Sequence, residues 1–365
     1  MIEDVEIGAR ESRAAGVSTL ERPGKDAGDP RGERRPTLAE VAQLAGVSLK
    51  TASRAVNGEK YVAVDTRERV LAAAAQLGFR INAMASLLKR GVTSNMVALI
   101  TGDLGNPFYS VLAKGVESEL RAHGLQLTIA SSDERVEDEH NLIDEFVSRR
   151  VRALILVSTM DSHAALHTVQ DRGISMIFVD RPPIGLDADS FVLDNYSGTR
   201  TAIEQLLAHG HRRIGYISDF SRLPTHRERA RGFSDAMTAA GVPDWQRYVE
   251  TGAHDGASAE RLVTEMLKRE APPTAFFAGN NQLTIGAVKA ITRHAPGTAL
   301  IGFDDFELAD VLGVTTVSHD PSEMGRLAAR RVLQVDRHFD QQAEQHVLPT
   351  RIIARGSGER APLVG

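Results

Sequence analysis

From Met96 onward the chain alternates short apolar runs with amphipathic segments. Segments such as YSVLAKGVESELRAHG and GTRTAIEQLLAHG, which have helical apolar spacing, lie between the runs. Apolar strands that alternate with helices are typical of parallel sheets covered on both faces. Because this pattern is longer than one sheet normally needs, we predict two α/β lobes with a cleft between them. The runs are MVALI, LQLTIA, RALILV, SMIFVD, FVLD, RIGYIS, TAFFAG and TALIGF.

The preceding segment RPTLAEVAQLAGVSLKTASRAVN predicts two short helices joined by a tight turn. Thr37 and Glu40 have the spacing of a capping box, and helical apolar spacing follows until Gly46. Ser48 is expected to cap a second helix whose Ala52 points inward. Together with a third helix, these elements predict an all-α helix-turn-helix headpiece over residues 36–80.

The third helix is expected from Thr66 to Leu77, with Asp65 or Thr66 as its N-cap. The following NAMASLLKR predicts a hinge helix over residues 81–92 that is too short to be stable alone.

The other boundaries follow from the change of pattern along the chain. Residues 1–35 are rich in Gly, Pro, Ser and charge, which predicts a disordered arm. We expect the two-lobed core over 95–357 and a tail over 358–365. The expected N-lobe is about 95–192 and 318–342, and the expected C-lobe is about 193–317 and 343–357.

Composition narrows the class of protein. The 365 residues, 42% hydrophobic and 25% charged, are typical of a globular protein with two or three domains. No run approaches the ~18 apolar residues of a membrane helix, and the N-terminus lacks the features of a signal peptide. The absence of cysteine excludes disulfides and thiolate chemistry. We therefore expect a cytoplasmic protein without a membrane partner.

Charge is unevenly divided along the chain. Residues 31–90 hold 11 Lys or Arg against 5 Asp or Glu, whereas residues 91–365 hold 28 against 36. A basic module before an acidic one indicates a polyanion as the partner of the first module only. Chance scatter of surface charge is the alternative.

The outward face of the second helix carries residues suited to DNA. Lys50 and Arg54 can donate to guanine O6 and N7 in a major groove, while Leu49 meets apolar base edges. Residues suited to phosphate contacts are Ser48, Thr51, Ser53 and Asn57. The alternative is a three-helix packing unit with solvated charges. In the hinge, an adjacent Leu87 and Leu88 could supply a minor-groove wedge or dimer packing.

These segments together resemble the lac repressor family of bacterial transcription regulators. The headpiece and hinge resemblance lies in TLAEVAQLAGVSLKTASRAVNG, TRERVLAAAAQLGFRIN and NAMASLL. The resemblance to the effector core, which is periplasmic-binding-protein-like, lies in VDRPP, LDNYSGTRTAIEQLLAHGHRRIGYIS, RARGF, TAFFAGNNQLTIGAV, IGFDD and TTVSHDPSEMG. The likeness covers about residues 36–357 in order.

The resemblance implies a homodimer that binds a pseudo-palindromic double-stranded operator, most often as a repressor, and so acts on the nucleoid. By position, Leu88 would be the minor-groove wedge and Asn82 the hinge N-cap. Leu49 and Lys50 would be the variable base readers, and Arg54 the more constant one. No leucine heptads follow residue 340, which favours a dimer over a tetramer.

The resemblance also implies a small-molecule effector, sugar-like or nucleobase-like, between the lobes. An Arg guanidinium and an Asp carboxylate from different lobes could bridge one ligand and couple binding to closure. The positions implied for effector contacts are Asn106, Phe108, Tyr109, Arg229, His254, Asn280 and Asp304. Without the resemblance, Arg229 reads as a surface ion pair and Asp304 as an ordinary strand-end turn.

Three positions depart from the family pattern, and enzyme motifs are absent. Ile81 replaces a usual proline, Ala52 a valine and Asn281 an aspartate. No Walker loop, dinucleotide fingerprint or G-x-S-x-G elbow occurs, so we expect neither an enzyme nor a cofactor. The spacing of His163 and His167 is the closest to a metal site, but such pairs are usually surface residues, and we expect no metal. The rival classes are a sugar-uptake binding protein and a hydrolase or isomerase.

Overall fold

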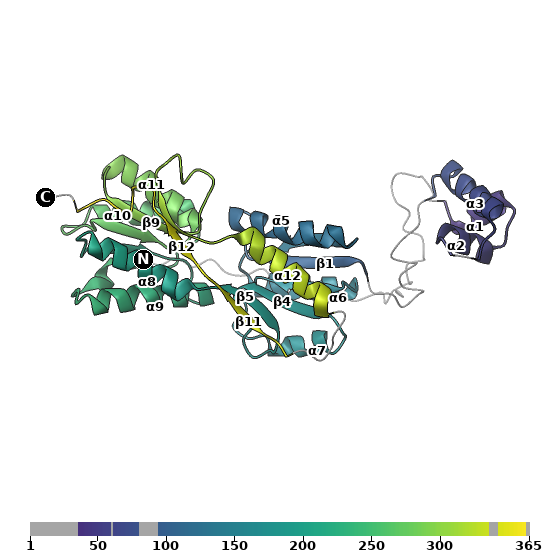
Figure 1. The fold of residues 1–365 in the computed structure, drawn as a ribbon, viewed down its shortest axis with the longest axis horizontal. Helices are drawn as coiled ribbons and strands as arrows, with labels where there is room; N and C mark the ends of the chain where they lie inside the picture. Colours follow the sequence, from purple (N-terminus) through teal and green to yellow (C-terminus); the bar gives the residue numbers. More distant parts are fainter. Residues whose placement is uncertain (1–35, 60, 80–93, 336–341, 363–365) are drawn as a thin grey trace, which may run out of the picture. The chain divides into compact units, whose positions relative to one another are not determined.

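The computed structural model describes residues 36–59, 61–79, 94–335 and 342–362 (Figure 1). It divides the chain into two units, Met1–Arg90 and Gly91–Gly365. The predicted arm over 1–35 and hinge helix over 81–92, with Ile81, Asn82 and Leu88, lie outside the described residues. These predictions therefore stay predictions.

The first unit contains the three predicted headpiece helices, α1 (Leu38–Ala45), α2 (Leu49–Val56) and α3 (Val64–Gln76). The capping box is present, because the Glu40 backbone N–H donates to Thr37 Oγ1 while the Glu40 carboxylate accepts from the Thr37 N–H. Gly46 then ends α1 with φ +66°, a left-handed conformation that glycine adopts without strain. The headpiece core is formed by Val41, Ala42, Ala45, Ala52, Ala55, Val70, Ala73 and Ala74, all buried.

The prediction for the start of the third helix was wrong. The N-cap is Ala63, which provides no side-chain cap, and not Asp65 or Thr66. The reason is tertiary: Val62 packs against the headpiece core. The chain therefore turns into the helix earlier than the capping preference of Asp or Thr would place it.

The N-lobe is a parallel six-stranded sheet of order β11-β5-β4-β3-β1-β2. Helices α5 (Pro107–Ala122) and α12 (Pro321–Val335) cover one face, and α6 (Val136–Ser148) and α7 (His167–Gln170) cover the other (Figure 1). The strands are β1 (Met96–Thr101), β2 (Gln126–Ser131), β3 (Ala153–Leu156), β4 (Ser175–Asp180), β5 (Asp189–Leu193) and β11 (Gln345–Leu348). A short 3-10 turn, Ala164–Leu166, precedes α7.

The C-lobe repeats this plan with the sheet order β12-β10-β9-β8-β6-β7. Helices α8 (Asn195–Ala208) and α9 (Pro224–Ala239) cover one face, and α10 (Gly256–Leu267) and α11 (Asn281–His294) cover the other. Only β12 runs antiparallel to its neighbour among the described strands of this sheet. The strands are β6 (Ile214–Ile217), β7 (Val249–Glu250), β8 (Ala275–Ala278), β9 (Ala299–Phe303), β10 (Thr315–Ser318) and β12 (Arg351–Ile353). A 3-10 turn, Trp245–Tyr248, precedes β7.

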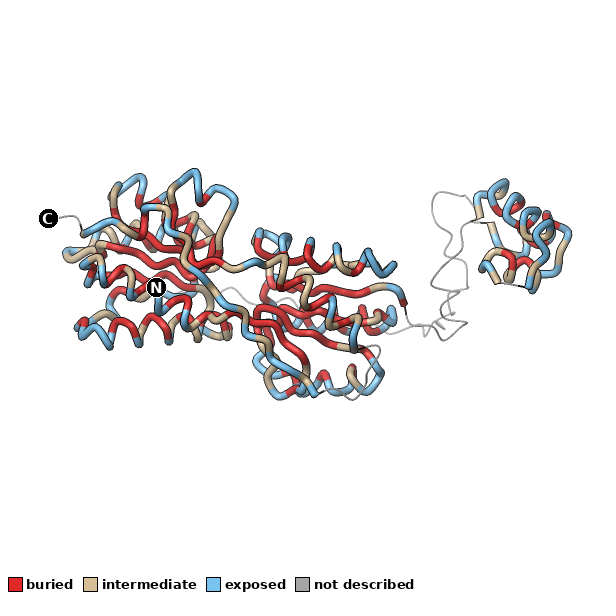
Figure 2. Tube along the Cα trace, in the orientation of Figure 1, coloured by how far each residue is buried: buried red, intermediate tan, exposed pale blue. Residues whose placement is uncertain are grey.

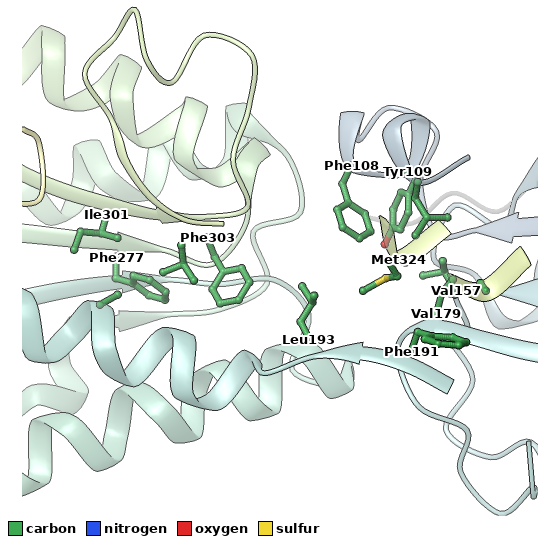
Figure 3. Close-up of a cluster of buried hydrophobic side chains, with 14 of the residues drawn as sticks. Phe108, Tyr109, Val157, Val179, Phe191, Leu193, Phe277, Ile301, Phe303 and Met324 are labelled. Carbon is green, nitrogen blue, oxygen red and sulfur yellow. The ribbon is translucent and has the colours of Figure 1, made fainter. Parts of the chain in front are cut away.

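The central strands of both sheets are buried on both faces, as the continuous apolar runs predict. In β1, Val97 and Leu99 pack toward α5 and α12, whereas Ala98 and Ile100 pack toward α6. Figure 2 shows the central strands of both lobes as buried. Figure 3 shows buried side chains of both lobes that belong to one cluster, with Leu193 between those of the N-lobe and those of the C-lobe. The predicted two-lobed α/β core with parallel sheets is confirmed.

Two predicted boundaries were wrong. Residues 343–357 do not all belong to the C-lobe, because Gln345–Leu348 pairs with β5 as the edge strand of the N-lobe sheet. The predicted tail is in part structured, because the carbonyl of Arg360 accepts a hydrogen bond from His211 Nε2 and Glu359 contacts Gln205. Both errors concern edge segments, whose position depends on residues about 150 positions away.

Candidate functional site

The headpiece presents the predicted DNA-contacting residues on and beside α2. Leu49 is 54% exposed and Lys50 is exposed. Ser48 caps α2, since its Oγ accepts from the Thr51 N–H at 3.1 Å. Ser48 must therefore serve the helix and any phosphate at the same time.

The other predicted DNA contacts already have partners within the headpiece. Arg54 Nε donates to Glu59 Oε2 at 3.1 Å. Asn57 Nδ2 donates to the Ser53 carbonyl at 2.7 Å, so its amide is turned toward the end of the helix. The sequence pattern did not single out Glu59.

A second candidate site lies between the lobes of the core. The carboxyl ends of the parallel strands of both sheets meet there, which is where open α/β sheets bind ligands. All seven residues predicted for effector contacts line one cavity, together with residues that the sequence reasoning missed. The predicted residues are Asn106, Phe108, Tyr109, Arg229, His254, Asn280 and Asp304. The missed residues are Asp103, Glu134, Asp180, Arg181, Ser218, Asp219, Leu223, Thr225, His226, Gly279 and Gln282.

Arg229 and Asp304 form a buried pair on the floor of this cavity. Arg229 donates from Nε to Asn195 Oδ1 at 2.8 Å and from a terminal nitrogen to the Gly279 carbonyl, and its guanidinium lies 3.7 Å from the ring centre of Phe303. A terminal nitrogen of Arg229 lies 3.8 Å from Asp304 Oδ2. Burial raises the pKa of Asp304 although Arg229 opposes that shift.

This geometry corrects two expectations. Arg229 and Asp304 both belong to the C-lobe, from α9 and the end of β9, so they cannot bridge a ligand between lobes as predicted. The alternative reading of Arg229 as a surface ion pair was also wrong, because its side chain is only 7% exposed. Both residues line the cavity from the C-lobe alone.

The N-lobe contributes a second buried ion pair. Arg181, directly after β4, donates to both carboxylate oxygens of Glu134 at 2.6 and 2.8 Å, and both side chains are 4% exposed. Arg181 also lies 3.5 Å from the hydroxyl of Tyr109 and 3.7 Å from Asp180. Burial raises the pKa of Asp180, and Arg181 lowers it less. The VDRPP segment therefore lines the cavity, although the sequence reasoning gave it no role.

His254, Asp219 and Asn280 form a polar cluster on the C-lobe wall. Asp219 accepts from His254 Nδ1 at 3.0 Å and from Asn280 Nδ2 at 3.2 Å. The hydrogen bond to Asp219 raises the pKa of His254. Burial alone would raise the pKa of Asp219. The hydrogen bond from His254 is the largest of the opposing effects, and together they hold the pKa of Asp219 below its ordinary value. The His254 ring stacks on Phe220 at 4.9 Å, so one face of the imidazole is already covered.

His319 lies on the crossover from β10 to α12, where the chain passes between the lobes. Its side chain is 3% exposed, its Nδ1 is 3.8 Å from Asp304 Oδ1, and its ring centre is 5.3 Å from that of Phe108. Neither ring nitrogen, nor Asp304 Oδ1, has a hydrogen-bond partner among the described residues. Burial lowers the pKa of His319 to about 4, so the ring is neutral at pH 7.

Direct hydrogen bonds join the lobes around the cavity. Asn281 donates to Asn106 Oδ1 at 2.9 Å, and Gln282 donates to Asp103 Oδ2 at 3.0 Å. Arg222 donates to the Glu134 carbonyl at 2.6 Å. The cavity holds about 40 Å³, against ~300–1,000 Å³ for ordinary ligand pockets. The lobes therefore adopt a closed arrangement that has to open before a sugar-sized molecule can enter.

The described part of the chain shows neither a cluster of metal ligands nor a membrane-spanning helix. His163 is buried before a 3-10 turn, bonded to Ser158 Oγ and the Ile184 N–H, rather than paired with His167 on a helix. No group of three or more His, Asp or Glu that could hold a metal is found among residues whose placement is described. Within the same ranges, no helix is both long and apolar enough to cross a bilayer.

Comparison with known proteins identifies the two units. Residues 37–82 match the family described as bacterial regulatory proteins, lacI family, and residues 203–358 match a periplasmic binding protein-like domain. The HTH-type transcriptional regulator GalS of Salmonella typhimurium is 32% identical over 304 residues, which cover 82% of this chain and 89% of GalS.

Solved structures agree with this relationship. A lacI family transcriptional regulator from Silicibacter pomeroyi has a TM-score of 0.77 at 25% identity, covering 89% of this chain and 100% of that chain. The transcriptional regulator CelR, solved as a cellobiose complex, has a TM-score of 0.65 at 27% identity, covering 88% and 100%. A basic helix-turn-helix headpiece, a two-lobed core and these relatives lead to one conclusion. The chain belongs to the lacI family of bacterial regulatory proteins and is a DNA-binding transcriptional regulator, not an enzyme.

Proposed function

We propose that this regulator is a homodimeric repressor whose affinity for a pseudo-palindromic operator on the nucleoid is controlled by a small neutral sugar bound between the lobes. The observation that carries the proposal is the convergence of all seven predicted effector contacts on one interlobe cavity. A sequence-specific regulator with a ligand site between movable lobes has the two coupled sites that allostery requires.

The proposed DNA site is the exposed face of α2. We assign base reading to Leu49, Lys50 and Arg54, and phosphate contacts to Ser48, Thr51, Ser53 and Asn57. We assign Leu88 and Asn82, which lie outside the described residues, to wedging and capping in a hinge that folds on DNA.

The charges around the cavity support a neutral ligand with many hydroxyl groups. Both guanidinium groups of the lining are already paired, Arg181 with Glu134 and Arg229 with Asp304. Carboxylates outnumber them, so hydroxyl donors find acceptors whereas a phosphate would meet negative charge. Aromatic Phe108 and Tyr109 offer apolar surface for the faces of a sugar ring. The related regulator CelR was solved with cellobiose, a neutral sugar of this kind.

Closure supplies the proposed coupling. A ligand shifts the lobe equilibrium only if it binds one arrangement better, and this site takes residues from both lobes, such as Tyr109 and Asp304. The start of the core adjoins the hinge in sequence, so a change of lobe angle alters the spacing of the two hinges in a dimer. Operator affinity then depends on the effector.

The first test is selection of random double-stranded DNA on the full-length protein at near-physiological salt, without added sugar. The expected result is an enriched pseudo-palindrome with a defined centre. Leu88→Ala should weaken binding to that sequence more than binding to a scrambled duplex. Equal losses on both duplexes would contradict the wedge role.

The second test adds sugars to the selected complex. Cellobiose, D-galactose and D-ribose represent neutral ligands, and D-fructose 1-phosphate represents an anionic one. We expect a neutral sugar to change operator affinity and the phosphorylated sugar to have no effect. A response to the phosphate alone would overturn the neutral-ligand assignment while leaving the regulator assignment intact.

A further inference from the structure

The carboxylate of Glu59, just beyond the end of α2, contacts the guanidinium of Arg54. Glu59 Oε2 accepts from Arg54 Nε at 3.1 Å, and the two side chains are 42% and 37% exposed. The contact uses only the Nε edge of the guanidinium. The two terminal nitrogens of Arg54 make no hydrogen bond to any other residue that the structure describes.

The backbone around Glu59 is fixed by the end of the helix. Gly58 has φ +72°, its N–H donates to the Ala55 carbonyl, and the Glu59 N–H donates to the Arg54 carbonyl at 3.0 Å. This is the pair of bonds of a Schellman motif, which turns the chain back over the last helical turn. The guanidinium of Arg67 in α3 donates to the Glu59 carbonyl. The backbone of Glu59 is therefore hydrogen-bonded to both α2 and α3, independently of the contact between its side chain and Arg54.

A carboxylate on Nε changes what an arginine can do at DNA. A free arginine side chain adopts many rotamers and binds phosphate as readily as base. When Nε is held, the terminal nitrogens form a fixed fork, which is the geometry that the O6 and N7 acceptors of guanine require. The negative charge of Glu59 also disfavours an approach of this arginine to a phosphate.

We propose that Glu59 is a positioning residue that directs Arg54 to guanine, so that it sets the sequence selectivity of the headpiece rather than its overall affinity for DNA. The proposal rests on the proposed function, in which α2 enters the major groove. The competing reading is that Glu59 merely neutralises Arg54. Its removal would then strengthen binding to every sequence.

The experiment compares full-length wild type, E59A, E59Q, R54A and the double variant R54A/E59A. Each is measured on the duplex selected by the wild type and on a scrambled duplex of the same composition, at one salt concentration. E68A is the matched control, because Glu68 is an exposed acidic residue of α3 whose loss changes the net charge equally.

We expect E59A to lower the ratio of selected to scrambled affinity about tenfold, while its scrambled affinity follows that of E68A. E59Q should keep most of the ratio, because its amide oxygen still accepts from Arg54 Nε. In the R54A background, E59A should have no further effect on the ratio.

Three results would overturn the proposal. The first is an E59A ratio equal to or above that of the wild type, and the second is an equal loss in the R54A background. The third is an R54A protein that keeps the wild-type ratio, which removes Arg54 as a reader but leaves the regulator assignment standing. If the wild type selects no sequence, both the proposed function and this inference fail. If E59A proves unstable, E59Q carries the test, because a selected-to-scrambled ratio as low as that of R54A would contradict the hydrogen-bond role assigned to Glu59.

Discussion

Two aspartates at the cavity occupy equivalent places in the two lobes. Asp180 ends β4 and Asp304 follows β9, which are the third strands of sheets ordered β11-β5-β4 and β12-β10-β9. Each has φ +66°, in the left-handed region that is uncommon for residues other than glycine, although aspartate enters it more often than most. Each is buried with a raised pKa. Unusual backbone conformations and buried carboxyl groups are frequent at functional sites, which supports the proposed effector site.

Asp304→Asn should separate binding from stability. Because burial outweighs the attraction of Arg229 and raises the pKa of Asp304, the charged form is disfavoured in the folded core. We expect the effector-free variant to keep or raise its free energy of unfolding at pH 7, measured by urea. Its affinity for the effector should fall about 10- to 100-fold, since a hydrogen bond to a charged group contributes about 1.5–3 kcal/mol.

The matched control for this variant is Asp244→Asn, an exposed aspartate that also has a positive φ, of 52°. It should leave both stability and effector response unchanged. An Asp304→Asn protein with wild-type sugar response would remove Asp304 from the binding surface.

His319 should make the core sensitive to acid. Its folded pKa of about 4 lies below the ordinary value of 6.5, so the unfolded chain binds the proton first as the pH falls. The free energy of unfolding that depends on a neutral His319 ring is therefore lost as the pH falls from about 6.5 to about 4. Between pH 7.5 and 4 the wild type should lose about 3 kcal/mol more unfolding free energy than His319→Gln. Parallel urea titrations at several pH values measure this, and equal slopes would mean that His319 does not titrate in this way.

At the scale of elements, the three headpiece helices differ in how the backbone N–H groups at their starts are capped. The first helix has a complete capping box, the second has Ser48, and the third begins at Ala63 without a side-chain cap. Caps satisfy backbone N–H groups that the helix leaves unpaired. The stability of the three-helix unit is therefore unevenly supported, and its weak end is the start of α3.

Two substitutions at helix starts should act in opposite directions. Thr37→Ala removes the capping box and should destabilise the headpiece by about 0.5–2 kcal/mol. Ala63→Ser adds a cap acceptor at the start of α3 and should stabilise it by up to about 1 kcal/mol. Thermal melting of the headpiece transition in the full-length protein checks both signs. A neutral Ala63→Ser would show that the N–H groups there are satisfied by water at no cost.

At the scale of the whole core, stability against opening depends on a few interlobe contacts. Arg222 from the C-lobe donates to the Glu134 carbonyl and, at 3.3 Å, to Thr159 Oγ1 in the N-lobe. Its guanidinium also lies 4.5 Å from the ring centre of Phe220, which stacks on His254. The contact of Arg222 across the cleft is therefore linked, through Phe220, to His254 in the wall of the cavity.

Arg222→Ala should favour the open arrangement. The absence of native cysteine allows dyes to be placed on cysteines introduced at the exposed positions Asp161 and Lys268, one in each lobe. We expect the variant to show a larger interlobe distance by fluorescence transfer, because it lacks two hydrogen bonds across the cleft. Arg213→Ala is the control, since the side chain of Arg213 donates to the Pro272 carbonyl within its own lobe. Identical distances in the two variants would show that Arg222 does not hold the lobes together.

The sequence by itself determined what depends on neighbours along the chain. The Thr37–Glu40 box and the start of α2 at Ser48 follow from contacts three residues apart. The buried strands follow from apolar runs, because both faces of each sheet are covered. Family motifs were sufficient to select seven residues that line one cavity.

Only the tertiary structure decided what depends on distant partners. The lobe of Gln345–Leu348 is set by pairing with β5, about 155 residues earlier. The Arg229–Asp304 pair lies within one lobe because α9 and β9 pack there. Arg181 meets Glu134 although 47 residues separate them. Such contacts produce no periodic pattern in the sequence, because their free energy comes from burial and pairing in the folded core. Residues that neighbour them along the chain therefore give no sign of them.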